Sequence, residues 1–134
     1  MTVRIWDIRD GSAKVFTGSP FSVWSVRFSP NGQHVAAGNF FGGLWIWNVR
    51  TGRMIQNWNA HEHYISDVVF MPDGKGLLSC GDGKVTHWDV SSLGMVESNG
   101  NTMPKKILEY EDHTVCPFSS ASPIYVSLRI YVLH

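Results

Sequence analysis

The sequence is poor in charge, in cysteine and in long apolar runs, and each shortage excludes a class of protein. Of its 134 residues 16% are charged, and 11 basic residues balance 11 acidic ones. A neutral chain of this kind is neither a charged disordered tail nor a typical nucleic-acid binder. Two cysteines are too few for a disulfide-built scaffold. The longest strongly apolar run, residues 124–133, contains Arg129 and is too short to span a bilayer as a helix.

The sequence also lacks the short motifs that indicate catalysis or a bound cofactor. It contains no Gly-x-Ser-x-Gly, no Gly-x-x-x-x-Gly-Lys-Ser/Thr, no His-Glu-x-x-His and no Cys-x-x-Cys. His61 and His63 are two residues apart, a spacing that puts both imidazoles on one face of a strand, but no third metal ligand is evident. We therefore expect a protein that is not an enzyme and that has no metal site and no cofactor.

Tryptophan, in contrast, is abundant, and three of the six tryptophans mark a repeat. Trp6, Trp47 and Trp88 are each followed by Asp or Asn and are spaced 41 residues apart. A second anchor repeats at an offset of 42 residues, because Val-Trp-Ser-Val-Arg-Phe-Ser-Pro-Asn-Gly at 23–32 aligns with Ile-Ser-Asp-Val-Val-Phe-Met-Pro-Asp-Gly at 65–74. Two independent anchors at nearly one period indicate an array of stacked supersecondary units.

Within each unit, short strand-like runs alternate with tight turns. The runs are rich in Val, Ile, Phe and Trp, and turn sequences such as Pro-Asn-Gly and Pro-Asp-Gly separate them. No stretch has a convincing helical pattern. The sequence therefore predicts an all-β fold with four strands in each unit. The expected strands are 23–28, 34–39, 44–49, 54–58, 65–70, 76–80, 85–89 and 105–110.

These residues carry a resemblance to a known repeat family. Thr-Val-Arg-Ile-Trp-Asp at 2–7, Ala-His-Glu-His-Tyr-Ile at 60–65 and Gly-Asp-Gly-Lys-Val-Thr-His-Trp-Asp at 81–89 resemble WD40 repeats. The resemblance implies a partial β-propeller of about three blades, each a four-stranded antiparallel sheet, in a ring that is not closed. In this family each blade takes its outermost strand from the following repeat.

The resemblance also divides the chain. Residues 1–113 are expected to form the partial propeller, with repeats that end near Trp6, Trp47 and Trp88 and a polar insert at 91–106. Residues 114–134 do not match a repeat and form a divergent tail, so the chain is expected to be a piece of a propeller. The segment 22–38 and the polar insert look most like the propeller of fungal Tup/Groucho-type transcriptional corepressors.

A hydrogen-bonded network is implied for one blade. In WD40 blades a His bonds an Asp in the turn between the second and third strands, and a Ser or Thr and the third-strand Trp complete the network. By position these roles fall to His61, Asp82 and Trp88. The slots for Ser or Thr hold Leu78 and Cys80, which leaves the fourth member in doubt.

The preceding blade departs further from this pattern. Phe41 stands in its Asp slot and Gly18-Ser19 in its Gly-His slot, so that only Trp47 of the network remains. We therefore expect that blade to depend on apolar packing.

The resemblance further implies peptide binding on the wider face of the propeller, near its channel. Half of the main positions there are aromatic, and aromatic side chains are enriched at binding hot spots. For Trp24 and Phe40, packing between blades is an equal alternative. The expected partner-binding residues are Ser22, Trp24, Phe40, Tyr64 and Ser66, with Gly81 as a further position and with His63 and Phe41 beside them.

Together these features predict a protein-interaction module that belongs to a larger complex. The corepressor resemblance implies a nuclear protein that binds peptide segments of DNA-bound transcriptional repressors, with histone tails as further candidates, and that does not itself contact nucleic acid or membranes. The alternative is a WD40 scaffold of another complex, in RNA processing or ubiquitin-ligase substrate recognition, with a cytoplasmic location as the alternative to a nuclear one.

Overall fold

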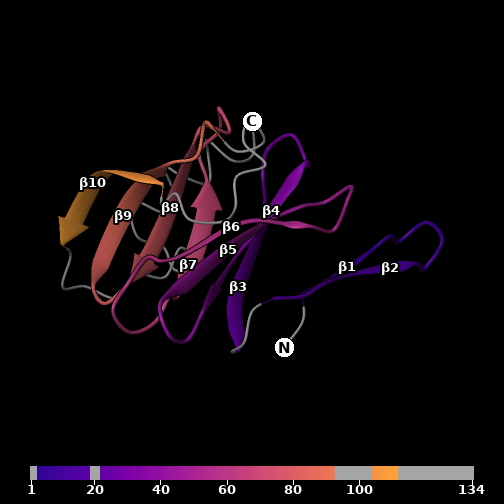
Figure 1. Cartoon of the computed structure of the whole chain (residues 1–134), viewed down its shortest axis with the longest axis horizontal. Helices are drawn as coiled ribbons and strands as arrows, with labels where there is room; N and C mark the ends of the chain where they lie inside the picture. Colours follow the sequence, from indigo (N-terminus) through magenta and orange to yellow (C-terminus); the bar gives the residue numbers. More distant parts are fainter. Residues whose placement is uncertain (1–2, 19–21, 93–103, 112–134) are drawn as a thin grey trace.

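The computed structural model describes residues 3–18, 22–92 and 104–111, whose strands form three separate sheets (Figure 1). The first sheet is the hairpin β1-β2, and the other two are four-stranded, in the orders β3-β4-β5-β6 and β7-β8-β9-β10. All neighbouring strands are antiparallel. The strands β1 to β10 are, in order, Val3–Trp6, Ala13–Phe16, Val23–Phe28, His34–Asn39, Gly43–Asn48, Met54–Asn59, Asp67–Phe70, Gly76–Gly81, Lys84–Asp89 and Lys105–Glu111.

This arrangement confirms the predicted fold class. The sheets succeed one another along the chain, from the indigo hairpin to the orange strand β10, and none of them closes into a barrel, as in part of a WD40 propeller (Figure 1). The first and last residues of each predicted strand lie within two residues of those of an observed strand. The described part of the chain has no helix, and so none long and apolar enough to cross a membrane.

Two of the predicted divisions of the chain fall largely outside the described residues. Strand β10 begins at Lys105, so the last two residues of the polar insert predicted at 91–106 belong to a strand. Residues 93–103 and the predicted tail, 114–134, are not described, and the insert and the tail therefore stay predictions.

The two middle strands of the central sheet, β4 and β5, are buried on both faces. Side chains alternate between the two faces of a strand. In β5, Trp45 and Trp47 therefore pack toward the β1-β2 hairpin, against Val3 and Phe16. The intervening residues of β5 join the second core, which continues into the sheet β7 to β10. This burial on both sides explains why β5 reads as a nearly continuous apolar run, Gly-Leu-Trp-Ile-Trp-Asn.

A polar contact ties the first strands of the two four-stranded sheets together. The hydroxyl of Ser25 in β3 donates to Oδ1 of Asp67 in β7 at 2.6 Å. Arg27 reaches Oδ2 of the same carboxylate at 3.3 Å. Because Asp67 is buried and a buried charge is costly unless it is paired, these contacts join β3 to β7 at a defined register.

Candidate partner-binding surface

The segment 60–66 crosses from one four-stranded sheet to the next, and the β4–β5 turn of the first sheet holds it. The amide of Ala60 donates to the carbonyl of Gly42 at 2.8 Å, and the amide of Ile65 donates to the carbonyl of Asn39 at 3.0 Å. The Asn39 side chain orders this turn, because its Oδ1 accepts from the amides of Phe41 and Gly43.

The β8–β9 turn of the second sheet holds the same segment from the other side. The amide of Ser66 donates to the carbonyl of Cys80 at 2.7 Å, and the amide of His63 donates to Oδ2 of Asp82 at 3.0 Å. Asp82 and Gly83 form the two-residue turn, with positive φ at both positions, as a tight hairpin requires. The crossover segment is therefore fixed between two hairpin turns.

Asp82 acts as an acceptor for a cluster of backbone amides. Partial burial raises the pKa of this carboxyl, but the amides of His63, Tyr64 and Glu62 outweigh that effect, and the pKa lies below its ordinary value. Asp82 therefore carries its negative charge at neutral pH and draws the crossover segment onto the turn.

Close backbone approach explains two glycines beneath this segment. A Cβ on Gly42 would overlap the carbonyl oxygen of His61, and a Cβ on Gly81 would overlap that of Tyr64. Gly81 is itself buried, so it supports the predicted surface and does not line it. The lack of a side chain at both positions lets the crossover segment lie directly on the two turns.

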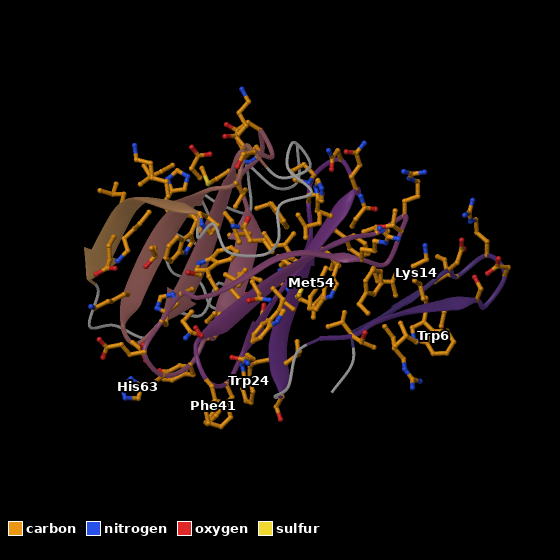
Figure 2. The ribbon with its side chains drawn as sticks, in the orientation of Figure 1. Trp6, Lys14, Trp24, Phe41, Met54 and His63 are labelled. Carbon is orange, nitrogen blue, oxygen red and sulfur yellow. The ribbon has the colours of Figure 1, made fainter. Side chains whose placement is uncertain are left out.

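Four exposed aromatic residues gather where these turns meet, and we call them the aromatic cluster: Trp24, Phe40, Phe41 and Tyr64. Their exposed fractions are 68%, 54%, 57% and 45%, respectively. The ring centroid of Phe40 lies 6.5 Å from that of Trp24, 5.9 Å from that of Phe41 and 6.4 Å from that of Tyr64. Figure 2 shows Trp24, Phe41 and His63 at one edge of the molecule, away from Trp6 on the hairpin.

Trp24 and Phe40, for which the sequence left surface exposure and packing between blades as alternatives, are both exposed in the described structure. Both side chains lie at the surface and are not packed between the sheets. Ser22 and His63 are also exposed, and Nδ1 of His63 lies 3.4 Å from Oδ1 of Asp82. Ser66 is half-buried, and its hydroxyl donates to the carbonyl of Cys80 at 3.1 Å. Of the predicted surface residues, Ser66 is therefore turned toward the sheet.

The network beneath the cluster contains a member that the sequence reasoning missed. Ser79 Oγ lies 2.8 Å from Nε2 of His61 and accepts from Nε1 of Trp88 at 2.9 Å. Asp82, expected to bond His61, reaches the amide of His63 instead. Burial lowers the pKa of His61, and the charge of Asp82 only partly offsets this effect. The imidazole is therefore neutral at pH 7.

The assignment of the Ser or Thr slots to Leu78 and Cys80 was wrong by one residue. Ser79 pairs with Thr86, two residues before Trp88, and this places it on the same face of the sheet as Trp88. Leu78 and Cys80 lie on the opposite face, in a separate apolar cluster. A shift of one residue along a strand reverses the face, and no local sequence signal distinguishes the two registers here.

The expectation that the preceding blade depends on apolar packing alone was also incomplete. The indole of Trp47 is buried and donates from Nε1 to the carbonyl of Thr17 at 2.9 Å. Ala37 pairs with Trp45 as Ser79 pairs with Thr86, so it occupies the serine position without a hydroxyl. A backbone carbonyl therefore replaces the serine as acceptor. Gly18 and Ser19 stand at the Gly-His position of this blade, and Ser19 lies outside the described residues.

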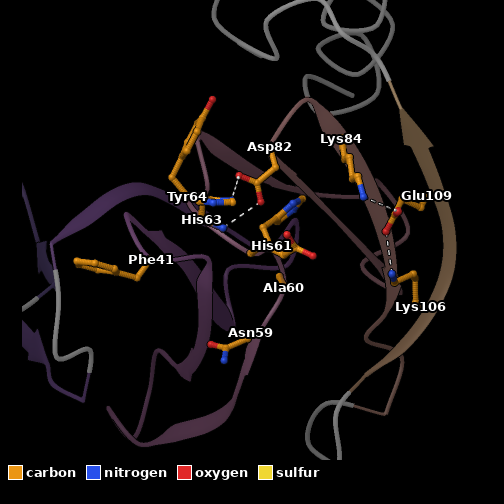
Figure 3. Close-up of a pocket in the computed structure, with 11 residues that line it drawn as sticks. Phe41, Asn59, Ala60, His61, His63, Tyr64, Asp82, Lys84, Lys106 and Glu109 are labelled. Atoms are coloured by element: carbon orange, nitrogen blue, oxygen red, sulfur yellow. Dashed lines mark hydrogen bonds and ion pairs between the residues drawn. The ribbon is translucent and has the colours of Figure 1, made fainter.

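A hollow of about 870 Å³ opens beside the aromatic cluster (Figure 3). Phe41 and Tyr64 line it, together with Glu62 and His63 of the crossover segment. On the side away from Phe41, Glu109 contacts Lys84 at 3.4 Å and Lys106 at 2.7 Å. The sequence reasoning did not predict this hollow, because it combines residues of the crossover segment with residues of β9 and β10.

Comparison with known families matches this architecture. The family model described as WD domain, G-beta repeat (WD40) matches residues 11–48 and 52–89, more than half of the chain. The chain therefore belongs to the WD40 repeat family. Strand β6 lies in the second match but pairs with β5 of the first, so repeat and sheet are out of phase, as predicted. WD40 domains are generally non-catalytic scaffolds that bind protein partners within complexes.

Individual relatives share only part of their length with this chain. Nuclear distribution protein PAC1 of Arthroderma otae is 33% identical over 102 residues, which cover 68% of this chain and 22% of PAC1. The WD repeat domain-containing protein 83 homolog of Dictyostelium discoideum is 30% identical over 79 residues, covering 59% of this chain and 24% of that protein. Pre-rRNA-processing protein IPI3 of Mycosarcoma maydis is 31% identical over 75 residues, which cover 55% of this chain and 13% of IPI3. These names do not refer to transcriptional repression.

Proposed function

We propose that this chain is a non-catalytic protein-interaction module that holds a peptide segment of a partner on the aromatic cluster. The observation that carries this proposal is the contiguous exposure of four large aromatic side chains, one at the start of β3 and three on neighbouring loops. Rigid aromatic rings provide large contact areas and dominate the energetics of many interfaces. The partner segment would contribute apolar anchors that pack on these rings.

The loops beneath the cluster support this proposal because they are held in place before a partner binds. Tyr64 lies on the crossover segment, which both hairpin turns fix through backbone hydrogen bonds. Phe41 lies in the β4–β5 turn, which the buried Asn39 side chain orders. A surface that is already ordered loses little conformational entropy on binding, which favours affinity.

Two settings are proposed for the wider complex. The sequence resemblance supports a nuclear corepressor that binds DNA-bound repressors or histone tails. The names of the relatives support the alternative about equally, since they include a pre-rRNA-processing protein and a nuclear distribution protein. The aromatic cluster is compatible with either complex, and with either a nuclear or a cytoplasmic location.

Selection of phage-displayed random peptides on the immobilised chain tests the binding surface. Peptides that require the cluster should lose about 30-fold in affinity on Trp24→Ala or Tyr64→Ala, the loss typical of hot-spot truncation. The matched control is Trp6→Ala, which removes an equally large exposed side chain from the distant hairpin. The proposal fails if no selected peptide depends on Trp24, or if the two cluster variants melt many degrees lower than wild type.

Identification of proteins that co-purify with the chain distinguishes the two settings. Transcriptional repressors or histones that are retained by wild type and lost with Trp24→Ala would support the corepressor. Ribosome-assembly factors or ubiquitin-ligase subunits that are lost in the same way would support the alternative.

A further inference from the structure

The chain segments that carry the aromatic cluster contain negative charge but no fixed positive charge. Segments 22–24, 39–43 and 60–66 contain Glu62 and neither Lys nor Arg. Glu62 is exposed at the edge of the hollow, and the adjoining turn adds the ionised carboxylate of Asp82. Lys84 and Lys106, the lysines that line the hollow, lie on its other side, where both contact Glu109 (Figure 3).

The aromatic rings at this end of the hollow offer a second attraction for a cation. Phe41 and Tyr64 both line the hollow, as does Glu62. Tyr64 also stacks against Phe40, with an interplanar angle of 25°. The face of an aromatic ring attracts Lys and Arg through its quadrupole, and a nearby carboxylate adds to that attraction.

From this combination we propose that the partner segment places a Lys or Arg side chain beside its apolar anchor. The basic group enters the hollow between the rings of Phe41 and Tyr64 and the carboxylate of Glu62, while the apolar anchor covers Trp24 and Phe40. This inference rests on the proposed function and adds the charge of the ligand to it. A segment with an acidic residue in this place would meet Glu62 and Asp82 and bind more weakly.

The peptide selection tests this inference when it is read for composition. Among peptides that bind wild type but not Trp24→Ala, Lys and Arg should be about threefold over-represented beside an apolar residue, relative to the unselected library. Cluster-dependent peptides without that enrichment, or with Asp or Glu in its place, would overturn the inference and leave the proposed function standing. If no peptide depends on Trp24, both fail.

A charge-neutralising variant separates this inference from general electrostatics. The most enriched basic peptide is compared with an analogue that has norleucine in place of its basic residue. Wild type should prefer the basic peptide, and Glu62→Gln should reduce that preference about threefold. Asp73→Asn, a control at an exposed acid on the β7–β8 turn, should leave it unchanged. Equal preferences in wild type and Glu62→Gln, or equal losses in both variants, would overturn the inference.

Discussion

The ring of Trp58 meets the ring of Trp88 edge-on, with centroids 5.5 Å apart and planes inclined by 67°. Trp58 lies on β6, the last strand of one sheet, and Trp88 lies on β9 of the next. Phe16 on β2 and Trp47 on β5 repeat this relationship, at 6.2 Å and 64°. In the first two of the three described sheets, an aromatic residue on the last strand therefore packs against the repeat tryptophan of the following sheet.

Removal of the Trp58 side chain from the Trp58–Trp88 pair should destabilise the packing between the two four-stranded sheets. We expect Trp58→Ala to lower the free energy of unfolding by about 3–5 kcal/mol, because a large buried side chain leaves a cavity. Phe41→Ala, which truncates an exposed ring, should cost much less. Urea unfolding followed by circular dichroism measures both, and equal losses would contradict the assignment of Trp58 to the core.

The indole nitrogens allow a finer comparison between the two aromatic pairs. Nε1 of Trp47 donates to the carbonyl of Thr17, whereas Nε1 of Trp58 is buried without a partner in the described structure. Trp47→Phe leaves an acceptor unpaired, while Trp58→Phe removes an unpaired donor. We therefore expect Trp58→Phe to cost less than Trp47→Phe in the same unfolding experiment. The reverse order would contradict the hydrogen-bond assignment.

Ser79 should be more important for stability than its size indicates. Ser79→Ala removes the hydroxyl shared by His61 and Trp88 and leaves two buried polar groups unpaired. The expected loss is about 1–3 kcal/mol. Ser91→Ala, at an exposed serine, should stay within about 0.5 kcal/mol of wild type. Thermal melts of the two variants give the comparison, and a neutral Ser79→Ala would contradict the network.

Stability should fall as the solution becomes mildly acidic. Burial lowers the pKa of His61 below its ordinary value of 6.5, and burial has the same effect on His34. Below pH 6.5 the unfolded chain therefore binds protons that the folded chain does not bind, and the free energy of unfolding decreases until the folded pKa is passed. Urea unfolding at a series of pH values between about 7.5 and 5 measures this slope.

Two variants measure how much each histidine contributes to the pH dependence of the free energy of unfolding. His61→Gln and His34→Gln should each make the dependence shallower, because each removes one group whose proton affinity differs between the two states. An unchanged slope in His61→Gln would show that the buried imidazole does not titrate as the structure implies.

Gly81 should be sensitive to the smallest side chain. Gly81→Ala places a methyl group on the carbonyl of Tyr64, so the crossover segment must move. The variant should lose stability and also lower the affinity of peptides that require the aromatic cluster. Gly11→Ala is the control: it introduces positive-φ strain of about 1 kcal/mol but meets no atom nearby. Peptide affinity that survives Gly81→Ala would show that Tyr64 is not needed.

Much of the architecture follows from the sequence by itself. The spacing of Trp6, Trp47 and Trp88 determines the repeat, and the Pro-Asn-Gly and Pro-Asp-Gly turns determine where strands end. These features are local, because turn geometry and strand propensity act over a few residues, and the predicted strands therefore lie close to the observed ones. The aromatic residues near the starts of the inner strands were likewise evident in the sequence.

Only the tertiary structure decided which side chains meet. The choice of Ser79 over Leu78 and Cys80 depends on the pairing register of β8 and β9, because neighbouring positions of a strand face opposite sides of the sheet. The exposure of Trp24 and Phe40 depends on how the two sheets stack. The hollow joins Tyr64 of the crossover segment to residues of β10, and long-range packing, which no local pattern encodes, brings these segments together.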